Sequence, residues 1–204
     1  MTTIKRVAVI GCGTVGASWA ALFLAHGLDV AAYDPSPGAE GRLRSFVDHA
    51  LDQLAELGIR GKGELRFSSD LAEVVTAADF VQENVPEDEA LKRQMLADID
   101  AFAAEGVVIA SSTSALLRSS IVADCRTPHR FIVAHPFNPP HLVPLVELVG
   151  EDEGIVQCAA DFYRTLGRRP VILRREMPGH IANRLSSALY REAVYLVEQG
   201  VASV

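Results

Sequence analysis

The sequence predicts an α/β protein with a Rossmann-like, doubly wound and mainly parallel sheet, followed by the start of a helical C-terminal domain. Three observations predict it. Apolar segments of strand length alternate with amphipathic segments of helix length along most of the 204 residues. The first strand runs into Gly11-Cys12-Gly13-Thr14-Val15-Gly16, and an acid, Asp34, follows the second. This alternation is typical of βαβ units with right-handed crossovers.

The first half of the chain switches regularly between the two periodicities. Strands are expected at 7–10, 30–33, 65–68 and 80–83, where short apolar runs lie between turn residues. Helices are expected at 14–26, 37–57 and 71–77, and Asp70 is a good N-cap for the last of these.

The second half begins in the same way and then changes. A helix at 87–103, a strand at 107–111 and a short helix near 116–123 continue the alternation. Strands at 130–134 and 143–149 then follow each other with only a loop between them, which predicts a mixed edge of the sheet. A helix at 153–166 and a strand at 171–173 complete this part.

Met177-Pro178-Gly179 interrupts the pattern, and helical spacing of apolar residues resumes at His180. We therefore expect two domains. Residues 1–177 form the Rossmann-like domain, and 178–204 form the first helix of a helical domain that is truncated or missing.

The glycine motif is suited to a dinucleotide. Gly11 permits a tight turn, Gly13 lets the backbone approach a pyrophosphate, and Gly16 lets the helix pack close to the strand. An acid 18 residues after Gly16 can accept hydrogen bonds from ribose hydroxyls and repels a 2′-phosphate, which favours NAD over NADP. The alternative is a glycine turn in a protein that binds no nucleotide. The cofactor-binding residues expected here are Gly11, Gly13, Thr14, Val15, Gly16 and Asp34.

Composition narrows the function classes. The net charge is −7 with no basic stripe, so neither nucleic acid nor an anionic membrane surface is an expected partner. The three cysteines are far apart, which favours a reducing compartment without disulfides. With no apolar run long enough to cross a bilayer and no signal-peptide pattern, we expect a cytoplasmic protein. No residue set has metal-ligand spacing, so no metal is expected.

A histidine and a glutamate are the strongest catalytic candidates. His135 begins a proline-rich loop after an expected strand, where ligands of open α/β sheets bind. Glu147 interrupts the apolar strand 143–149, and a carboxylate there is costly unless it is paired. Pairing would fix the imidazole tautomer and stabilise the imidazolium, as acid–base catalysis requires. The alternatives are a surface histidine and a glutamate on a solvated strand face.

Polar residues near other strand ends are weaker candidates. Ser114 ends a run of hydroxyl side chains that could bind substrate or cofactor, although capping of the next helix suits it equally. Asn183 lies about one turn into the last helix and could be a surface residue. Glu87 and Lys92 are, on sequence alone, an ordinary first-turn acid and a solvated helix lysine.

Five motifs in one order and register together resemble the L-3-hydroxyacyl-CoA dehydrogenase superfamily: Gly11-x-Gly13-x-x-Gly16 with Asp34, Gln82-Glu83-x-Val85-Pro86-Glu87, Ser112-Thr113-Ser114, His135-x-Phe137-Asn138-Pro139 through Glu147, and Pro178-Gly179-x-x-x-Asn183-Arg184. The resemblance implies NAD-dependent oxidation of a secondary 3-hydroxyl group, with His135 as the base and Glu147 orienting it. Ser114 and Asn183 would hold the reacting oxygen or the nicotinamide end.

The resemblance further implies that Glu87 and Lys92 contact the cofactor, and that a helical second domain makes a homodimer. The motifs look closest to the carnitine dehydrogenase and gulonate dehydrogenase/lambda-crystallin branch. Ala50 and Leu57 replace a serine and a lysine that acyl-CoA enzymes use for CoA, which favours a free β-hydroxy acid over a 3-hydroxyacyl thioester. Arginines nearby could substitute for them. A non-catalytic, crystallin-like NAD-binding protein and a dehydrogenase of carrier-bound hydroxyacyl groups are the alternatives.

Overall fold

The computed structural model describes residues 4–204, so the first three residues of the expected N-terminal domain lie outside the description. Eight strands form one sheet in the order β3-β2-β1-β4-β5-β6-β7-β8. The strands are β1 (Arg6–Ile10), β2 (Asp29–Tyr33), β3 (Leu65–Ser68), β4 (Phe80–Glu83), β5 (Val108–Ser111), β6 (Phe131–Pro136), β7 (Leu145–Gly150) and β8 (Arg169–Ile172). The helices are α1 (Thr14–Ala25), α2 (Ala39–Glu56), α3 (Leu71–Thr76), α4 (Glu89–Phe102), α5 (Arg118–Ile121), α6 (Glu153–Thr165) and α7 (Ala182–Glu198), with a 3₁₀ turn at Pro128–Arg130.

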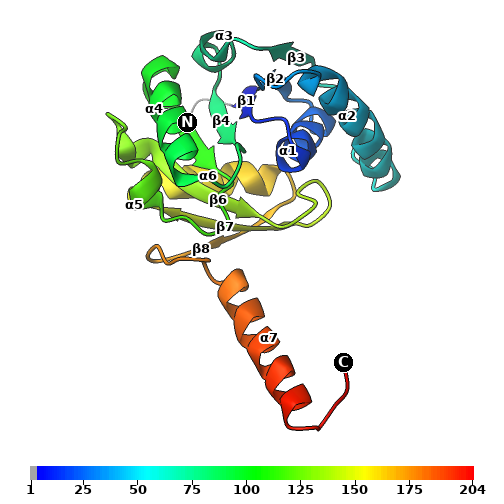
Figure 1. Ribbon diagram of the computed structural model, residues 1–204. Helices are drawn as coiled ribbons and strands as arrows, with labels where there is room; N and C mark the ends of the chain where they lie inside the picture. The colour runs from blue at the N-terminus through cyan, green and yellow to red at the C-terminus, as the bar shows by residue number, and fades with distance from the viewer. Residues whose placement is uncertain (1–3) are drawn as a thin grey trace.

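Helices cover both faces of the sheet, as Figure 1 shows. Successive strand residues point to opposite faces, so Val7 and Val9 of β1 pack with α1, α2 and α6, whereas Ala8 and Ile10 pack with α3, α4 and α5. The central strands β1, β4, β5 and β6 are buried on both sides and are mostly apolar. The predicted doubly wound fold is confirmed.

The mixed edge is confirmed as well. Six of the seven strand pairs are parallel, and only β6 and β7 run antiparallel. Their register places His135 directly opposite Glu147. The departure from parallel alternation therefore lies at the point in the sheet that carries the two catalytic candidates.

Two expected boundaries were wrong in ways that concern the site. His135 lies within β6, not in the loop after it, because its backbone still pairs with β7. Helix α4 begins at Glu89 because Asp88 caps it, its carboxylate accepting from the amide of Leu91 at 2.8 Å. Glu87 is therefore a turn residue and not a first-turn helix acid.

Helix α7 confirms the helical spacing expected from His180 onward. It projects away from the sheet (Figure 1), and none of its residues is buried. Asn183 is its second residue, closer to the helix start than expected. Membership of this helix in a second domain stays a prediction. Across residues 4–204, no helix has the length and apolar character needed to span a membrane.

Candidate functional site

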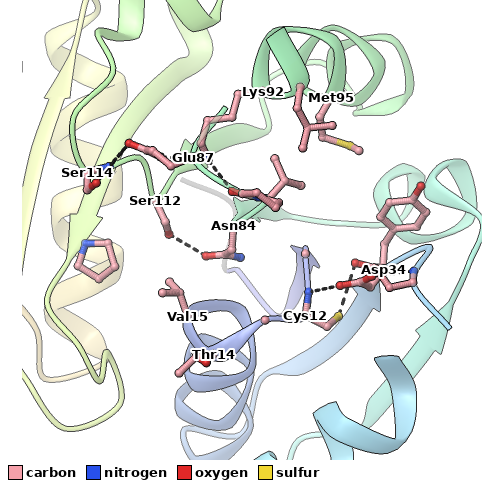
Figure 2. A pocket seen from close by; sticks show the side chains of 18 of the residues that line it. Cys12, Thr14, Val15, Asp34, Asn84, Glu87, Lys92, Met95, Ser112 and Ser114 are labelled. Atoms are coloured by element: carbon pink, nitrogen blue, oxygen red, sulfur yellow. Dashed lines mark hydrogen bonds and ion pairs between the residues drawn. The ribbon is translucent and has the colours of Figure 1, made fainter. Parts of the chain in front are cut away.

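A pocket of about 710 Å³ opens at the carboxyl ends of the central strands. Its lining comes from the segments that follow β1, β2, β4 and β5, together with His135 of β6. The strand order reverses between β1 and β4, and open α/β sheets bind ligands at such a point. Figure 2 shows Asp34 at one end of this pocket and Ser114 at the other.

The glycine turn has the geometry that a dinucleotide requires. Gly11 has a φ of +86°, and a Cβ there would lie 2.8 Å from the backbone of Asn84. A Cβ on Gly16 would lie 1.9 Å from the carbonyl oxygen of Gly11, so only glycine lets the helix pack this close. A Cβ on Gly13 would meet nothing within 4 Å. The space beside Gly13 at the start of α1 is therefore open to a phosphate.

Asp34 closes this end of the pocket. Its carboxylate accepts hydrogen bonds from the amides of Cys12 and Ser36, each at 2.9 Å. Burial raises the pKa of Asp34, but these hydrogen bonds and the charge of Arg42 outweigh it and leave the pKa below its usual value. Asp34 is thus an anion at this end of the pocket. Burial and the charge of Asp34 raise the pKa of the Cys12 thiol to about 12, which makes Cys12 a small filler and not a nucleophile.

Lys92 differs from the sequence interpretation, because it is buried rather than solvated. Its side chain is 1% exposed, and Nζ donates to Glu83 at 2.8 Å and to the carbonyl oxygen of Val85 at 2.9 Å. The other oxygen of Glu83 accepts from the hydroxyl of Ser111. Lys92 also lines the pocket. A cation is therefore held rigidly at the pocket wall.

Glu87 organises the loop after β5. Its Oε1 accepts from the hydroxyl of Thr113 at 2.7 Å and from the amides of Ser114 and Ala115 at 2.8 and 2.9 Å. Burial raises the pKa of Glu87, but the hydrogen bonds and the charge of Lys92 bring it below its usual value. The Ser114 hydroxyl lies 3.2 Å from the same carboxylate and does not cap α5, whose N-cap is Leu117. Ser114 is therefore held facing the pocket (Figure 2).

His135 and Glu147 form the expected pair. Nδ1 of His135 lies 2.8 Å from Oε2 of Glu147, and both side chains are buried. A carboxylate only accepts, so Nδ1 carries the proton and the lone pair is on Nε2. His135 lines the pocket, whereas Glu147 lies behind it.

Glu147 and Asn183 lie just outside the pocket lining. Oε1 of Glu147 accepts from the amides of Ile181 and Ala182 at the start of α7, each at 2.9 Å. Asn183 donates from Nδ2 to the carbonyl oxygen of Ser114 at 3.0 Å. The structure therefore brings Ser114, Asn183 and the His135–Glu147 pair to one end of the pocket.

Several lining residues had no role in the sequence interpretation. Leu91 and Met95 of α4 face the pocket, and Arg42 of α2 reaches it beside Asp34. The i, i+4 spacing of Leu91 and Met95 was the available signal, because it puts both on one helix face. His141, by contrast, is buried away from the pocket between Ser18 and Gln53. Within residues 4–204, no group of three or more His, Cys, Asp or Glu side chains could hold a metal ion.

A doubly wound sheet with a glycine turn, a pocket-lining acid after the second strand and a histidine–carboxylate pair defines the class of NAD-binding dehydrogenase domains. The sequence profile described as 3-hydroxyacyl-CoA dehydrogenase, NAD binding domain matches residues 6–177. The chain belongs to this family. NAD is its cofactor, and the residues of the glycine turn fit it.

Relatives agree with this assignment. A protein of Nocardiopsis dassonvillei named L-carnitine dehydrogenase is 48% identical over 98% of this chain and 63% of its own length. A 3-hydroxyacyl-CoA dehydrogenase of Gibberella moniliformis is 42% identical over 98% of this chain and 64% of its own length. The chain thus spans somewhat less than two thirds of these relatives.

A solved structure is also similar. It is the 5-formyl-3-hydroxy-2-methylpyridine 4-carboxylic acid 5-dehydrogenase, described as an NAD+-dependent dismutase. It superposes with a TM-score of 0.91 at 38% identity, covering 98% of this chain and 67% of that one.

Proposed function

We propose that this chain is the redox domain of an NAD-dependent dehydrogenase that oxidises the 3-hydroxyl group of a small β-hydroxy acid. The observation that carries the proposal is the His135–Glu147 pair, 2.8 Å apart, with His135 lining the same pocket as the glycine turn. A base with a fixed tautomer at the nicotinamide end of a dinucleotide site is suited to alcohol oxidation.

In this proposal, His135 takes the hydroxyl proton on Nε2, and Glu147 balances the charge that develops on the ring. NAD, when bound, supplies the hydride acceptor. Ser114 and Asn183 hold the reacting oxygen or the nicotinamide end, and their mutual hydrogen bond keeps the two together. Glu87 and Lys92 line the same pocket and contact the cofactor there.

L-carnitine is the first substrate to test, because relatives at 44–48% identity carry the name L-carnitine dehydrogenase. A free hydroxy acid also agrees with the structure of α2. Ala50 is buried in the core and Leu57 is an uncharged C-cap, so neither offers a cation to a CoA phosphate. L-gulonate and 3-hydroxyacyl thioesters are the other candidate substrates. The homodimer, the helical domain at 178–204 and the cytoplasmic location stay predictions.

The test follows NADH formation from L-carnitine, L-gulonate, 3-hydroxybutyrate and its CoA thioester. We expect turnover of at least one of these, and a loss of about 10³-fold in kcat for His135→Ala, since general base catalysis contributes about that much. NADH binding should stay within about twofold, because His135 adds little ground-state affinity. His129→Ala, at an exposed position, serves as the control. NAD binding without turnover of any panel member would favour the non-catalytic alternative.

A further inference from the structure

His180 packs against the proposed base. It lies in the turn before α7 and is 2% exposed. Its ring centroid is 5.2 Å from that of His135, with 42° between the ring planes, and the ring of Phe137 lies 4.9 Å from the same imidazole. The side chain of His135 therefore has neighbours from the loop after β6 and from the turn before α7.

Holding a histidine at this position is costly. In residues 4–204, His180 is the only non-glycine residue with a positive φ, at +50°. Its Nδ1 is also the only buried side-chain polar atom in that range without a hydrogen-bond partner. A glycine would relieve the backbone strain, and an apolar ring would avoid the unpaired nitrogen. Strained residues of this kind persist where their surroundings hold them, and they cluster at functional sites.

The surroundings of His180 do hold it. Nε2 lies 3.3 Å from the carbonyl oxygen of Thr113. A carbonyl only accepts, so Nε2 carries the proton and Nδ1 a lone pair. On the other side, Glu147 accepts from the amides of the next two residues, Ile181 and Ala182. The same carboxylate that orients His135 therefore also orients the turn that presents His180.

The ring of His180 is also uncharged at neutral pH. Burial lowers its pKa and so does the neighbouring His135, while the bond to Thr113 and the charges of Glu147 and Glu87 act in the opposite direction without offsetting the burial. The groups that face the ring are Thr113 in the loop after β5, His135 in β6, Glu147 in β7 and Glu87 in the turn before α4. An uncharged ring does not oppose the positive charge that His135 acquires with a proton.

We propose that His180 is a positioning residue for His135: anchored to Thr113, its imidazole holds the ring of His135 on Glu147, so that Nε2 of His135 faces the substrate hydroxyl. This inference rests on the proposed function, because it assigns His135 the role of base. It adds the turn before α7 to the groups that determine the catalytic rate.

Two variants remove the anchor and the ring in turn. His180→Phe keeps an aromatic ring but cannot donate to Thr113, and His180→Asn tolerates the positive φ but removes the ring. We expect each to lower kcat for hydroxy-acid oxidation about tenfold, while KM for NAD stays within about twofold, because misplacing a base affects the chemical step. His129→Phe, on the surface, should behave as wild type. Thermal melting and NADH binding verify that each variant is folded.

Imidazole nitrogen NMR at pH 7 provides a readout that needs no turnover. The wild type should show His180 as the neutral Nε2–H tautomer, and the Nδ1–H of His135 should be protected from exchange with solvent. Both variants should lose that protection. Unchanged kcat together with an unchanged His135 signal in both variants would overturn the proposal. If the wild type binds NAD without turnover but the His135 signal still responds, the positioning role stands and the proposed function fails.

Discussion

Lys92 and Glu83 form an ion pair, 2.8 Å long and at most 1% exposed at either side chain, in the wall of the NAD pocket. The Lys92 ammonium has Val85 as a further acceptor, and Glu87 lies 3.8 Å away. Glu83 is in turn bonded by the hydroxyl of Ser111 and the amide of Val85. Each partner is therefore hydrogen-bonded on several sides, which is what a buried pair needs to be tolerated.

Glu83→Gln should destabilise the fold. The substitution leaves a buried ammonium without its main counter-charge, and breaking such a pair costs about 3–5 kcal/mol. Urea unfolding measures the loss. The exposed pair of Glu64 and Arg66 is the control, and Glu64→Gln should leave the free energy of unfolding nearly unchanged. Equal stability of the two variants would contradict the prediction.

Alanine substitutions at two glycines of the turn should have different effects, one on cofactor binding and the other on stability. A Cβ at Gly13 enters open space in the pocket, and its backbone φ of −66° suits any residue. Gly13→Ala should therefore keep the melting temperature while weakening NADH binding at least about tenfold, since the methyl group occupies space needed by the pyrophosphate. A Cβ at Gly16 collides with the carbonyl oxygen of Gly11. Gly16→Ala should therefore melt at a lower temperature, because overpacking lowers the free energy of unfolding by about 1–3 kcal/mol.

NADH fluorescence titration and thermal melting on the two alanine variants check this contrast. Loss of stability in Gly13→Ala with unchanged binding would show that the glycine serves folding and not the cofactor.

Asp34→Ala should weaken the preference for NAD over NADP. The carboxylate repels a 2′-phosphate, and its removal frees Arg42, a neighbouring cation of the same pocket, to attract one. We expect the ratio of kcat/KM values for NAD and NADP to fall by about 10–100-fold, or about 1.4–2.8 kcal/mol. Asp48→Ala, an exposed substitution on α2, is the control. An unchanged ratio would exclude Asp34 from cofactor choice.

The free energy of unfolding should fall at acidic pH, in part because Asp100 becomes protonated. Burial raises the pKa of Asp100, but hydrogen bonds from Thr127, Arg130 and backbone amides outweigh it and lower the pKa below its usual value. A carboxylate with a lowered folded-state pKa stabilises the fold above its unfolded pKa of about 3.9, and this contribution is lost as pH falls through the folded value.

Urea unfolding between pH 6 and pH 2.5 measures this effect. The free energy of unfolding should fall less steeply with acid in Asp100→Asn than in the wild type, because the variant has no carboxyl to protonate. Asp48→Asn, at the exposed position on α2, is the control and should retain the wild-type slope. Identical slopes for Asp100→Asn and the wild type would contradict the assignment.

The fold could be predicted from local pattern because each element is encoded within its own segment. The alternation of strands and helices, the glycine motif and the acid after the second strand predict the doubly wound sheet and its NAD site. The pairing of His135 with Glu147 was also predictable, since a carboxylate in an apolar strand needs a partner and a histidine ends the neighbouring strand.

Other features depend on contacts between segments that only folding brings together. Lys92 and Glu87 look like ordinary helix residues until β4, β5 and α4 pack, and that packing buries the first and gives the second its loop partners. Nothing in the sequence pairs His180 with His135, and the two rings meet only in the folded chain, where Glu147 also binds the amide of Ile181 at the start of α7. The sequence by itself determined the sheet, the cofactor class and the pairing of His135 with Glu147. The tertiary structure alone decided which charges are buried and which side chains surround His135, because burial and hydrogen bonding depend on surroundings contributed by distant segments.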